Sequence, residues 1–273
     1  MRGNMSDREA SFVGNIPTFY DQGLGPVFFA DFADDIARCV AASAPIRVLE
    51  TAAGTGIVTR RLRDLLPQEA QLTATDLNPP MLEVARGKFR PEERVTFQPA
   101  DATSLPFPDN SFDAVVCQFG VMFFPDKDQA FREAYRVLAR GGRYVFNVWD
   151  SHGYNPIGRV MTEIPARFFP TDPPQFYQVP FSYYRIDPIK DSLTAAGFTE
   201  LRIAVLSLEK TIADPSVYAR ALVYGNPLID QIRARGGVDP EQVVDAVAEA
   251  LLNAFGTDPM RMPLQAIVFE ATK

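Results

Sequence analysis

The segment at residues 46–66 constrains the fold of this chain more than any other part of the sequence. Residues 46–49 form a short, mostly apolar run, which is typical of a buried strand and too short for a helix. Glu50 ends the run, and residues 51–56 carry only small side chains, so a ligand could lie directly against the backbone. In the helical pattern that follows, the apolar face holds Leu62, Leu65 and Leu66, and the other positions hold Arg60, Arg61, Arg63 and Asp64. A strand, a small-residue turn and a helix predict the ligand-binding corner of an open α/β sheet.

Strand patterns and helical patterns alternate along the rest of the chain. Strands are expected at residues 46–50, 71–76, 94–101, 112–119, 143–149, 200–212 and 264–271. Helices are expected at residues 27–42, 59–66, 78–89, 126–138, 187–196, 215–235 and 239–255. Gly141 and Gly142 are expected to end the helix at 126–138. Because the first five strands are almost wholly apolar, we expect a parallel sheet that is covered by helices on both faces.

Acidic residues mark the ends of the first three strands, namely Glu50, Asp76 and Asp101. The carboxyl ends of parallel strands meet at one edge of the sheet, and ligands bind at that edge. We therefore expect these carboxylates to lie near a bound ligand. Two of them also have simpler explanations, because Asp76 could cap the next helix and Asp101 could be a solvated loop residue.

The composition narrows the classes of partner. With 34 acidic and 27 basic residues the formal charge is −7, which argues against a nucleic acid or an anionic membrane. A single histidine, His152, and two cysteines, Cys39 and Cys117, without CxxC spacing predict no metal site and two reduced thiols in a cytoplasmic protein. No apolar run reaches the ~18 residues of a membrane span. We expect no secretory signal, whether the chain starts at Met1 or at Met5.

Several stretches, in the proper order, carry a resemblance to a known family. They are Val48-Leu49-Glu50-x-Ala-x-Gly54-Thr55-Gly56, Ala74-Thr75-Asp76-Leu77-Asn78-x-x-Met81-Leu82, Ala100-Asp101-Ala102-x-x-Leu105-Pro106-Phe107, and Phe112-Asp113-x-Val-x-x-Gln118-Phe119 followed by Arg136-Val137-Leu138-x-x-Gly141-Gly142. Over roughly residues 45–150 the chain resembles the class I S-adenosylmethionine-dependent methyltransferases, in particular the small-molecule group of the ubiquinone/menaquinone-biosynthesis type. The resemblance implies a Rossmann-like α/β fold, with a doubly wound, mostly parallel seven-stranded sheet and a helical cap. It also implies S-adenosylmethionine as the cofactor.

The resemblance further implies which residues contact that cofactor. The implied roles belong to Glu50 (the loop and the methionine amino group), Ala52, Gly54 and Gly56 (the backbone under the cofactor), Asp76 (both ribose hydroxyls), Leu77 and Met81 (near the adenine), Asp101 and Ala102 (the adenine edge), and Gln118 and Phe119 (the methionine part and the substrate). A carboxylate suits the ribose because its two oxygens can accept from both hydroxyls. Gln118 could instead satisfy backbone groups at the end of its strand.

The sequence departs from the family at Ala52, where a glycine is usual. An alanine is tolerated there if its backbone has a negative φ. A nicotinamide-binding protein is the main structural rival, but its G-x-G-x-x-G fingerprint needs a third glycine, and Thr59 stands in that place. Glu50 would also face a pyrophosphate with the wrong charge.

We expect one domain with three parts. These are residues 1–44 (an N-terminal lid and the first helix), 45–150 (the cofactor-binding core) and 151–273 (the rest of the sheet, with substrate-cap insertions at about 151–184 and 214–257). Tyr20 is expected in the lid over the cofactor, unless it belongs to the core. His152 follows the fifth strand and is the candidate general base, unless it is a surface-loop residue. The aromatic residues of 168–184 are expected to be shared between a substrate pocket and the core of the cap.

These expectations predict methyl transfer from S-adenosylmethionine to a small, partly apolar or aromatic molecule, at carbon, oxygen or nitrogen. The alternative is a non-catalytic member of the same fold that binds the cofactor or a protein, with Ala52 as its only mark. The expected partner is a small-molecule methyl acceptor, with no nucleic acid and no membrane span. A homodimer is left open.

Overall fold

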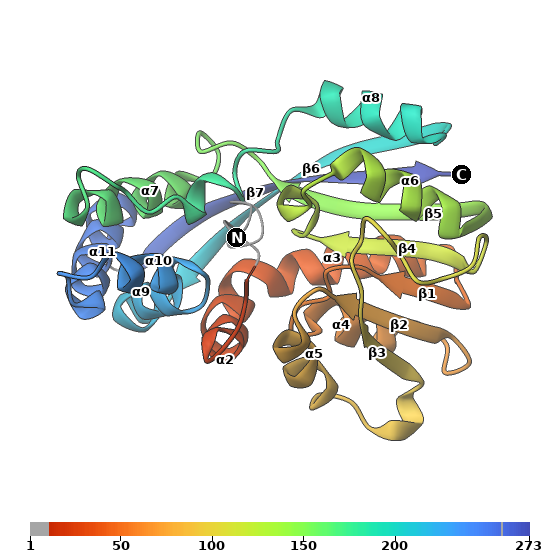
Figure 1. Ribbon diagram of the computed structural model, residues 1–273, viewed down its shortest axis with the longest axis horizontal. Helices are drawn as coiled ribbons and strands as arrows, with labels where there is room; N and C mark the ends of the chain where they lie inside the picture. The colour runs from red at the N-terminus through yellow and green to blue at the C-terminus, as the bar shows by residue number, and fades with distance from the viewer. Residues whose placement is uncertain (1–10, 258) are drawn as a thin grey trace.

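The computed structural model describes residues 11–257 and 259–273, which form a seven-stranded sheet with helices on both faces (Figure 1). The strands are β1 (Arg47–Glu50), β2 (Gln71–Asp76), β3 (Val95–Pro99), β4 (Phe112–Gln118), β5 (Leu138–Trp149), β6 (Glu200–Ile212) and β7 (Met260–Thr272). Their order is β3-β2-β1-β4-β5-β7-β6, and β7 runs antiparallel to both of its neighbours while the other pairs are parallel. The expected doubly wound, mostly parallel seven-stranded sheet is confirmed.

Helices pack on both faces of the sheet, because apolar side chains of its strands point alternately to one face and to the other. They are α2 (Ile16–Phe19), α3 (Ala30–Ala41), α4 (Ile57–Leu65), α5 (Pro79–Arg86), α6 (Lys127–Val137), α7 (Pro156–Phe168), α8 (Ile186–Ala196), α9 (Pro215–Tyr224), α10 (Leu228–Arg235) and α11 (Pro240–Phe255). Val48 and Val116 pack with Ile36 of α3 and Leu62 of α4, whereas Val115 points to the opposite face. Full burial of each such side chain adds about 1.5–3 kcal/mol to the free energy of unfolding, relative to leaving the side chain exposed.

A helical cap of α7, α9, α10 and α11 lies together beyond one end of the sheet (Figure 1). Its position follows from the topology, because α7 begins shortly after the carboxyl end of β5 and α9 shortly after that of β6. The cap therefore lies at the edge where the parallel strands end, which is where ligands bind in such sheets. Within the described part of the chain, no helix combines the length and the apolar character that crossing a membrane requires.

The N-terminal helical region differs from the expectation of a helix at 27–42 alone. The chain is already helical from Ile16, through a π-helix, η1 (Tyr20–Phe29), which continues into α3. At the junction the N–H of Ala30 donates to the carbonyl of Gly25, five residues earlier. The glycines and Pro26 read as a turn in the sequence, but Pro26 donates no hydrogen bond, and the wider π register accommodates it. Residues 1–10 of the expected lid lie outside the described residues.

Other boundaries also differ from those expected. Gly141 and Gly142 do not end a helix, because α6 stops at Val137 and β5 begins at once with Leu138. The expected helix at 215–235 is broken into α9 and α10, since Pro227 cannot continue an i→i−4 ladder. Two further differences are that α7 was not expected and that β7 begins at Met260 rather than at residue 264.

The apolar face expected for residues 59–66 is confirmed only in part, because Leu62 and Leu66 are buried but Leu65 is not. Leu65 is 48% exposed, whereas Arg63, expected off the apolar face, is buried. The guanidinium of Arg63 is satisfied by backbone carbonyls, including those of Ala70 at 2.8 Å and Leu66 at 3.1 Å. The last carbonyls of a helix have no partner within the helix, and the buried arginine donates to carbonyls there in place of water.

Candidate functional site

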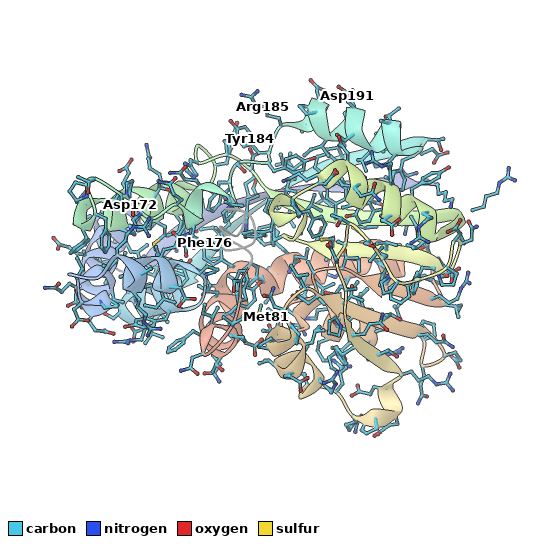
Figure 2. The ribbon with its side chains drawn as sticks, in the orientation of Figure 1. Met81, Asp172, Phe176, Tyr184, Arg185 and Asp191 are labelled. Carbon is cyan, nitrogen blue, oxygen red and sulfur yellow. The ribbon has the colours of Figure 1, made fainter. Side chains whose placement is uncertain are left out.

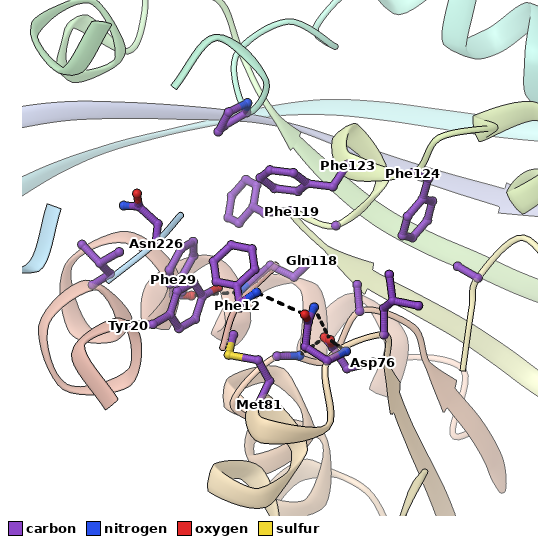
Figure 3. Close-up of a pocket in the computed structure, with 18 of the residues that line it drawn as sticks. Phe12, Tyr20, Phe29, Asp76, Met81, Gln118, Phe119, Phe123, Phe124 and Asn226 are labelled. Atoms are coloured by element: carbon purple, nitrogen blue, oxygen red, sulfur yellow. Dashed lines mark hydrogen bonds between the residues drawn. The ribbon is translucent and has the colours of Figure 1, made fainter. Parts of the chain in front are cut away.

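A cavity of about 300 Å³ opens at the carboxyl edge of the sheet, between the core and the cap (Figure 3). One end, called here the loop end, is formed by residues that follow β1, β2 and β3: Ala52, Gly54, Asp76, Leu77, Asn78, Met81, Ala100, Asp101 and Ala102. The other, called here the aromatic end, is formed mainly by Phe12, Tyr20, Phe28, Phe29, Phe119, Phe123, Phe124, Trp149, Phe176, Tyr177 and Phe181, with Gln118 and Asn226. The expected ligand edge is thus a single open cavity with a polar end and an apolar end.

The loop after β1 has backbone conformations that favour glycine. Gly54 and Gly56 have φ of 56° and 77°, and Ala52 has φ of 51°. The negative φ under which an alanine would be tolerated is therefore absent at Ala52, and this left-handed conformation costs an alanine about 1–2 kcal/mol. Its methyl group is accommodated by Gly120, since a Cβ at Gly120 would lie 2.5 Å from that of Ala52. Ala52 and Gly54 line the cavity, whereas Gly56 gives space to α5, where a Cβ would lie 2.9 Å from that of Ala85.

Asp76 ties the first two loops together at the cavity wall. One carboxylate oxygen accepts from the N–H of Gly54 and the other from the N–H of Asn78, each at 2.8 Å. The residue is only 7% exposed, and burial raises its carboxyl pKa, while these backbone donors hold it down. The side-chain amide of Asn78 also donates to the second oxygen at 3.2 Å. Since each carboxylate oxygen has two lone pairs, the first oxygen can still accept from a ligand hydroxyl, and the second can do so where a hydroxyl replaces that amide.

Glu50 does not line the cavity with the other acids. Its side chain is buried beneath the loop, where the hydroxyl of Thr59 donates to it. Burial raises the pKa of its carboxyl to about 8. In this geometry Glu50 supports the loop from below, and the structure does not bring its carboxylate to the cavity.

The four residues expected around the adenine all line the loop end: Leu77, Met81, Asp101 and Ala102. Met81 is buried, whereas Leu77 is 59% exposed at the rim of the cavity. One oxygen of Asp101 accepts from the N–H and hydroxyl of Thr103, at 2.8 and 2.7 Å. This short turn fixes the direction of the carboxylate, and its second oxygen can accept from a ligand.

Tyr20 lies over the glycine loop from the π-helix. Its ring stacks on Phe29 at 4.8 Å, and its hydroxyl lies 4.0 Å from the position that a Cβ of Gly54 would take. Burial raises the pKa of Tyr20 well above its usual value, and the charge of Asp76 raises it further. Tyr20 is therefore a neutral hydrogen-bond donor at the junction of the two ends of the cavity.

Gln118 and Phe119 reach the cavity from the end of β4. The amide nitrogen of Gln118 donates to the carbonyl of Phe29 at 3.2 Å, while its oxygen is buried without a partner among the described residues. Phe119 has φ of 49°, an uncommon conformation for a bulky residue, and stacks on Trp149 at 3.8 Å with 4° between the ring planes. Strain of this kind persists where packing fixes it, and it clusters at functional sites.

His152, like Glu50 and Gly56, is an expected site residue that does not line the cavity. Its ring packs against Phe181, with 5.2 Å between ring centroids, and its Nε2 atom is buried without a partner among the described residues. Burial lowers the pKa of the imidazole, which favours its neutral form. The structure does not place His152 where it could take a proton from a molecule in the cavity.

Several lining residues were not expected from the sequence, among them Phe12, Phe123, Trp149 and Asn226. The N–H of Phe12 donates to Asn78 at 3.1 Å, and its ring meets that of Phe123 edge-on at 6.2 Å, so it joins the two ends of the cavity (Figure 3). Trp149 ends β5, and the Gly-Asn-Pro turn before α10 was the available signal for Asn226. Within the described residues no group of three or more His, Cys, Asp or Glu side chains could hold a metal.

Comparisons with known proteins agree with this geometry. Residues 49–146 match the model of a methyltransferase domain. A demethylmenaquinone methyltransferase from Porphyromonas gingivalis is 32% identical over 186 residues, which cover 63% of this chain and 76% of that protein. The chain belongs to the class I S-adenosylmethionine-dependent methyltransferases. This family membership accounts for the order of its strands and for the carboxylates at the loop end.

Other similarities of this methyltransferase are shorter or more distant. A ubiquinone/menaquinone biosynthesis C-methyltransferase from Psychromonas ingrahamii is 38% identical over 116 residues, or 41% of this chain. The chain spans about half the length of that relative, 46%. The YcgJ protein of Bacillus subtilis shares the fold with a TM-score of 0.59 and 20% identity, over 89% of this chain and 98% of that one.

S-adenosylmethionine is the cofactor of this family, and the residues at the loop end fit it. Gly54 keeps the backbone bare beneath the cavity, and Asp76 offers two buried acceptor oxygens for a diol. The unpaired oxygen of Gln118 is a further acceptor for a ligand N–H or O–H group. The described lining holds hydrogen-bond acceptors of Asp76, Asp101 and Gln118 but no lysine or arginine, so it suits a ligand with a positive charge.

Proposed function

We propose that this methyltransferase transfers the methyl group of S-adenosylmethionine to a small, largely apolar and aromatic acceptor. One observation carries the proposal: the loop end and the aromatic end belong to a single cavity. Asp76 and Asp101 would hold the cofactor in the cavity that Phe119 and Trp149 also line, so that cofactor and acceptor could share it. The non-catalytic alternative has no comparable support, since the lining carboxylates are intact.

The protein's part in such a reaction is alignment and exclusion of water. The bound cofactor supplies an electrophilic methyl group. Tyr20 and Phe119 line the cavity with flat rings, against which a planar acceptor could be aligned with that group. Of the described residues that line the cavity, only Asp76 and Asp101 carry a charge, and both are at the loop end. The acceptor itself therefore supplies the electron-rich atom, and a general-base role for His152 finds no geometric support.

The aromatic end supports a quinone-like acceptor. Its rings offer flat apolar walls, and a charged acceptor would lose its hydration there without gaining a counter-charge. Relatives named for menaquinone and ubiquinone biosynthesis point to the same class. Methylation at carbon is the reaction in the name of one relative, and we propose it ahead of oxygen or nitrogen here.

The remaining assignments are proposals of the same kind. We propose residues 1–44 as a lid, 45–150 as the cofactor-binding core and 151–273 as the rest of the sheet with its cap, in a cytoplasmic protein. A homodimer stays a prediction, and light scattering on the purified chain at several concentrations would test it.

Methyl transfer can be tested with a reduced naphthoquinone as the acceptor. We expect the protein to form S-adenosylhomocysteine and a methylated naphthalenediol from S-adenosylmethionine and 1,4-naphthalenediol under anaerobic conditions, as measured by mass spectrometry. Phosphoethanolamine, a charged acceptor without a ring, should give no more S-adenosylhomocysteine than a reaction without acceptor. Equal or faster turnover of phosphoethanolamine, or no product from either compound, would contradict the proposed acceptor class.

A further inference from the structure

One wall of the aromatic end is a short segment that carries two aromatic rings into the cavity. Phe176 and Tyr177 belong to a 3₁₀ turn, η4 (Phe176–Gln178), and are 4% and 6% exposed. Phe176 stacks on Phe123 at 6.0 Å with 20° between the planes, and Figure 2 shows it deep between the cap and the core. The position of this turn therefore sets the width of the aromatic end.

Gln231 of α10 holds the turn from behind. Its side-chain oxygen accepts from two successive backbone N–H groups, those of Gln175 at 2.8 Å and Phe176 at 3.1 Å. The first N–H groups of a helical turn have no partner within the turn, and no side chain of η4 itself caps them. Gln231 supplies this cap from another helix, although it does not line the cavity.

Two further residues hold the same segment, namely Arg235 at the end of α10 and Asn226 just before α10. The guanidinium of Arg235 donates to the carbonyl of Asp172 at 2.6 Å and to that of Pro173 at 3.1 Å, and it is paired with the Asp172 carboxylate. On the other side of Gln231, the amide of Asn226 donates to the hydroxyl of Tyr177 at 2.9 Å. Arg235 thus fixes the backbone before the turn, Gln231 fixes the first N–H groups of the turn, and Asn226 fixes the ring of Tyr177.

We propose that Gln231 and Arg235 are positioning residues that determine which acceptors the aromatic end admits. They act through η4, by holding Phe176 and Tyr177 at the distance that a flat ring requires. The inference rests on the proposed function, because it takes the aromatic end as the seat of the acceptor. It does not involve the loop end, so cofactor binding should be independent of both residues.

The test compares Gln231→Met, which has a similar length but no acceptor oxygen, with Gln231→Glu, which keeps one. Arg233→Met is the matched control, because Arg233 lies on the same helix and faces the ring of Tyr224 instead. Hydrogen–deuterium exchange would follow residues 172–178. Calorimetry would measure the affinity for S-adenosylhomocysteine, and for 2-naphthol as a flat aromatic probe in its presence.

We expect Gln231→Met to exchange residues 172–178 about tenfold faster and to bind 2-naphthol about tenfold more weakly, since two hydrogen bonds are lost. Gln231→Glu should restore both, and all variants should bind S-adenosylhomocysteine as the wild type does. Unchanged exchange and 2-naphthol affinity in Gln231→Met, or a loss that Gln231→Glu does not repair, would overturn the inference. Failure of the wild type to bind S-adenosylhomocysteine would contradict the proposed function alone, because the exchange of residues 172–178 needs no cofactor and would still report on the turn.

Discussion

Glu50 is an acid whose surroundings favour its uncharged form. It is 3% exposed beneath the cofactor loop, and burial raises the pKa of its carboxyl from 4.5 to about 8, although the Thr59 hydroxyl opposes this. In the unfolded chain the pKa returns to its ordinary value. Between these two values the folded protein binds more protons than the unfolded chain, so the free energy of unfolding falls as the pH rises.

This linkage gives a prediction for stability against pH. From about pH 5 to about pH 8 Glu50 should lower the free energy of unfolding by at most about 1.4 kcal/mol per pH unit. Glu50→Gln should remove that contribution, and urea unfolding at several pH values measures the difference. Glu83→Gln is the control, since the Glu83 side chain is 68% exposed and paired with Arg86 within one helix. Identical pH dependence in Glu50→Gln and the wild type would refute the buried, protonated carboxyl.

Residues also show where sequence-based inference stops. Ala52 and Phe119 both have a positive φ, which their side chains disfavour and which only the surrounding packing explains. Gly120 accepts the methyl of Ala52, and Trp149 accepts the ring of Phe119. Such compensation between residues far apart in the chain is not visible in a local pattern.

Helix α4 is tied to its surroundings by one side chain in its last turn, that of Arg63. Arg63 joins the last turn of α4 to the chain before β2 and before β3, through carbonyls of Leu66, Ala70 and Glu93. All of these bonds go to backbone carbonyls and none to a carboxylate. Burial lowers the pKa of the guanidinium.

Replacement of this side chain should cost more than replacement of its neighbour. We expect Arg63→Met to lower the free energy of unfolding by about 3 kcal/mol, because several buried carbonyls lose a charged donor. Arg61→Met should cost less than about 0.5 kcal/mol, since Arg61 is half-exposed in a surface ion pair with Asp34. Chemical denaturation of both variants decides the matter, and equal effects would show that the buried contacts add nothing.

For the whole molecule, the part that could be predicted was the part with regular periodicity. The strands of the sheet and the acids at 76 and 101 follow from local apolar runs and their ends, and the structure brings these acids to the cavity. The cap was expected at about 151–184 and 214–257, and α7 and α9 to α11 lie in those ranges, but helix α7 itself and the break between α9 and α10 were not expected. The contacts of Phe12, Gln231 and Asn226 depend on segments that meet only in the folded chain.

The central claim is that the loop end binds S-adenosylmethionine through the Asp76 carboxylate. Calorimetric titration with S-adenosylhomocysteine, on the wild type and on Asp76→Ala, tests it most directly, with thermal unfolding as the check that the variant is folded. Two charge-assisted hydrogen bonds to a diol are at stake, so we predict that Asp76→Ala stays folded and binds at least about a hundredfold more weakly. An affinity within about threefold of the wild type in a folded variant would contradict the claim.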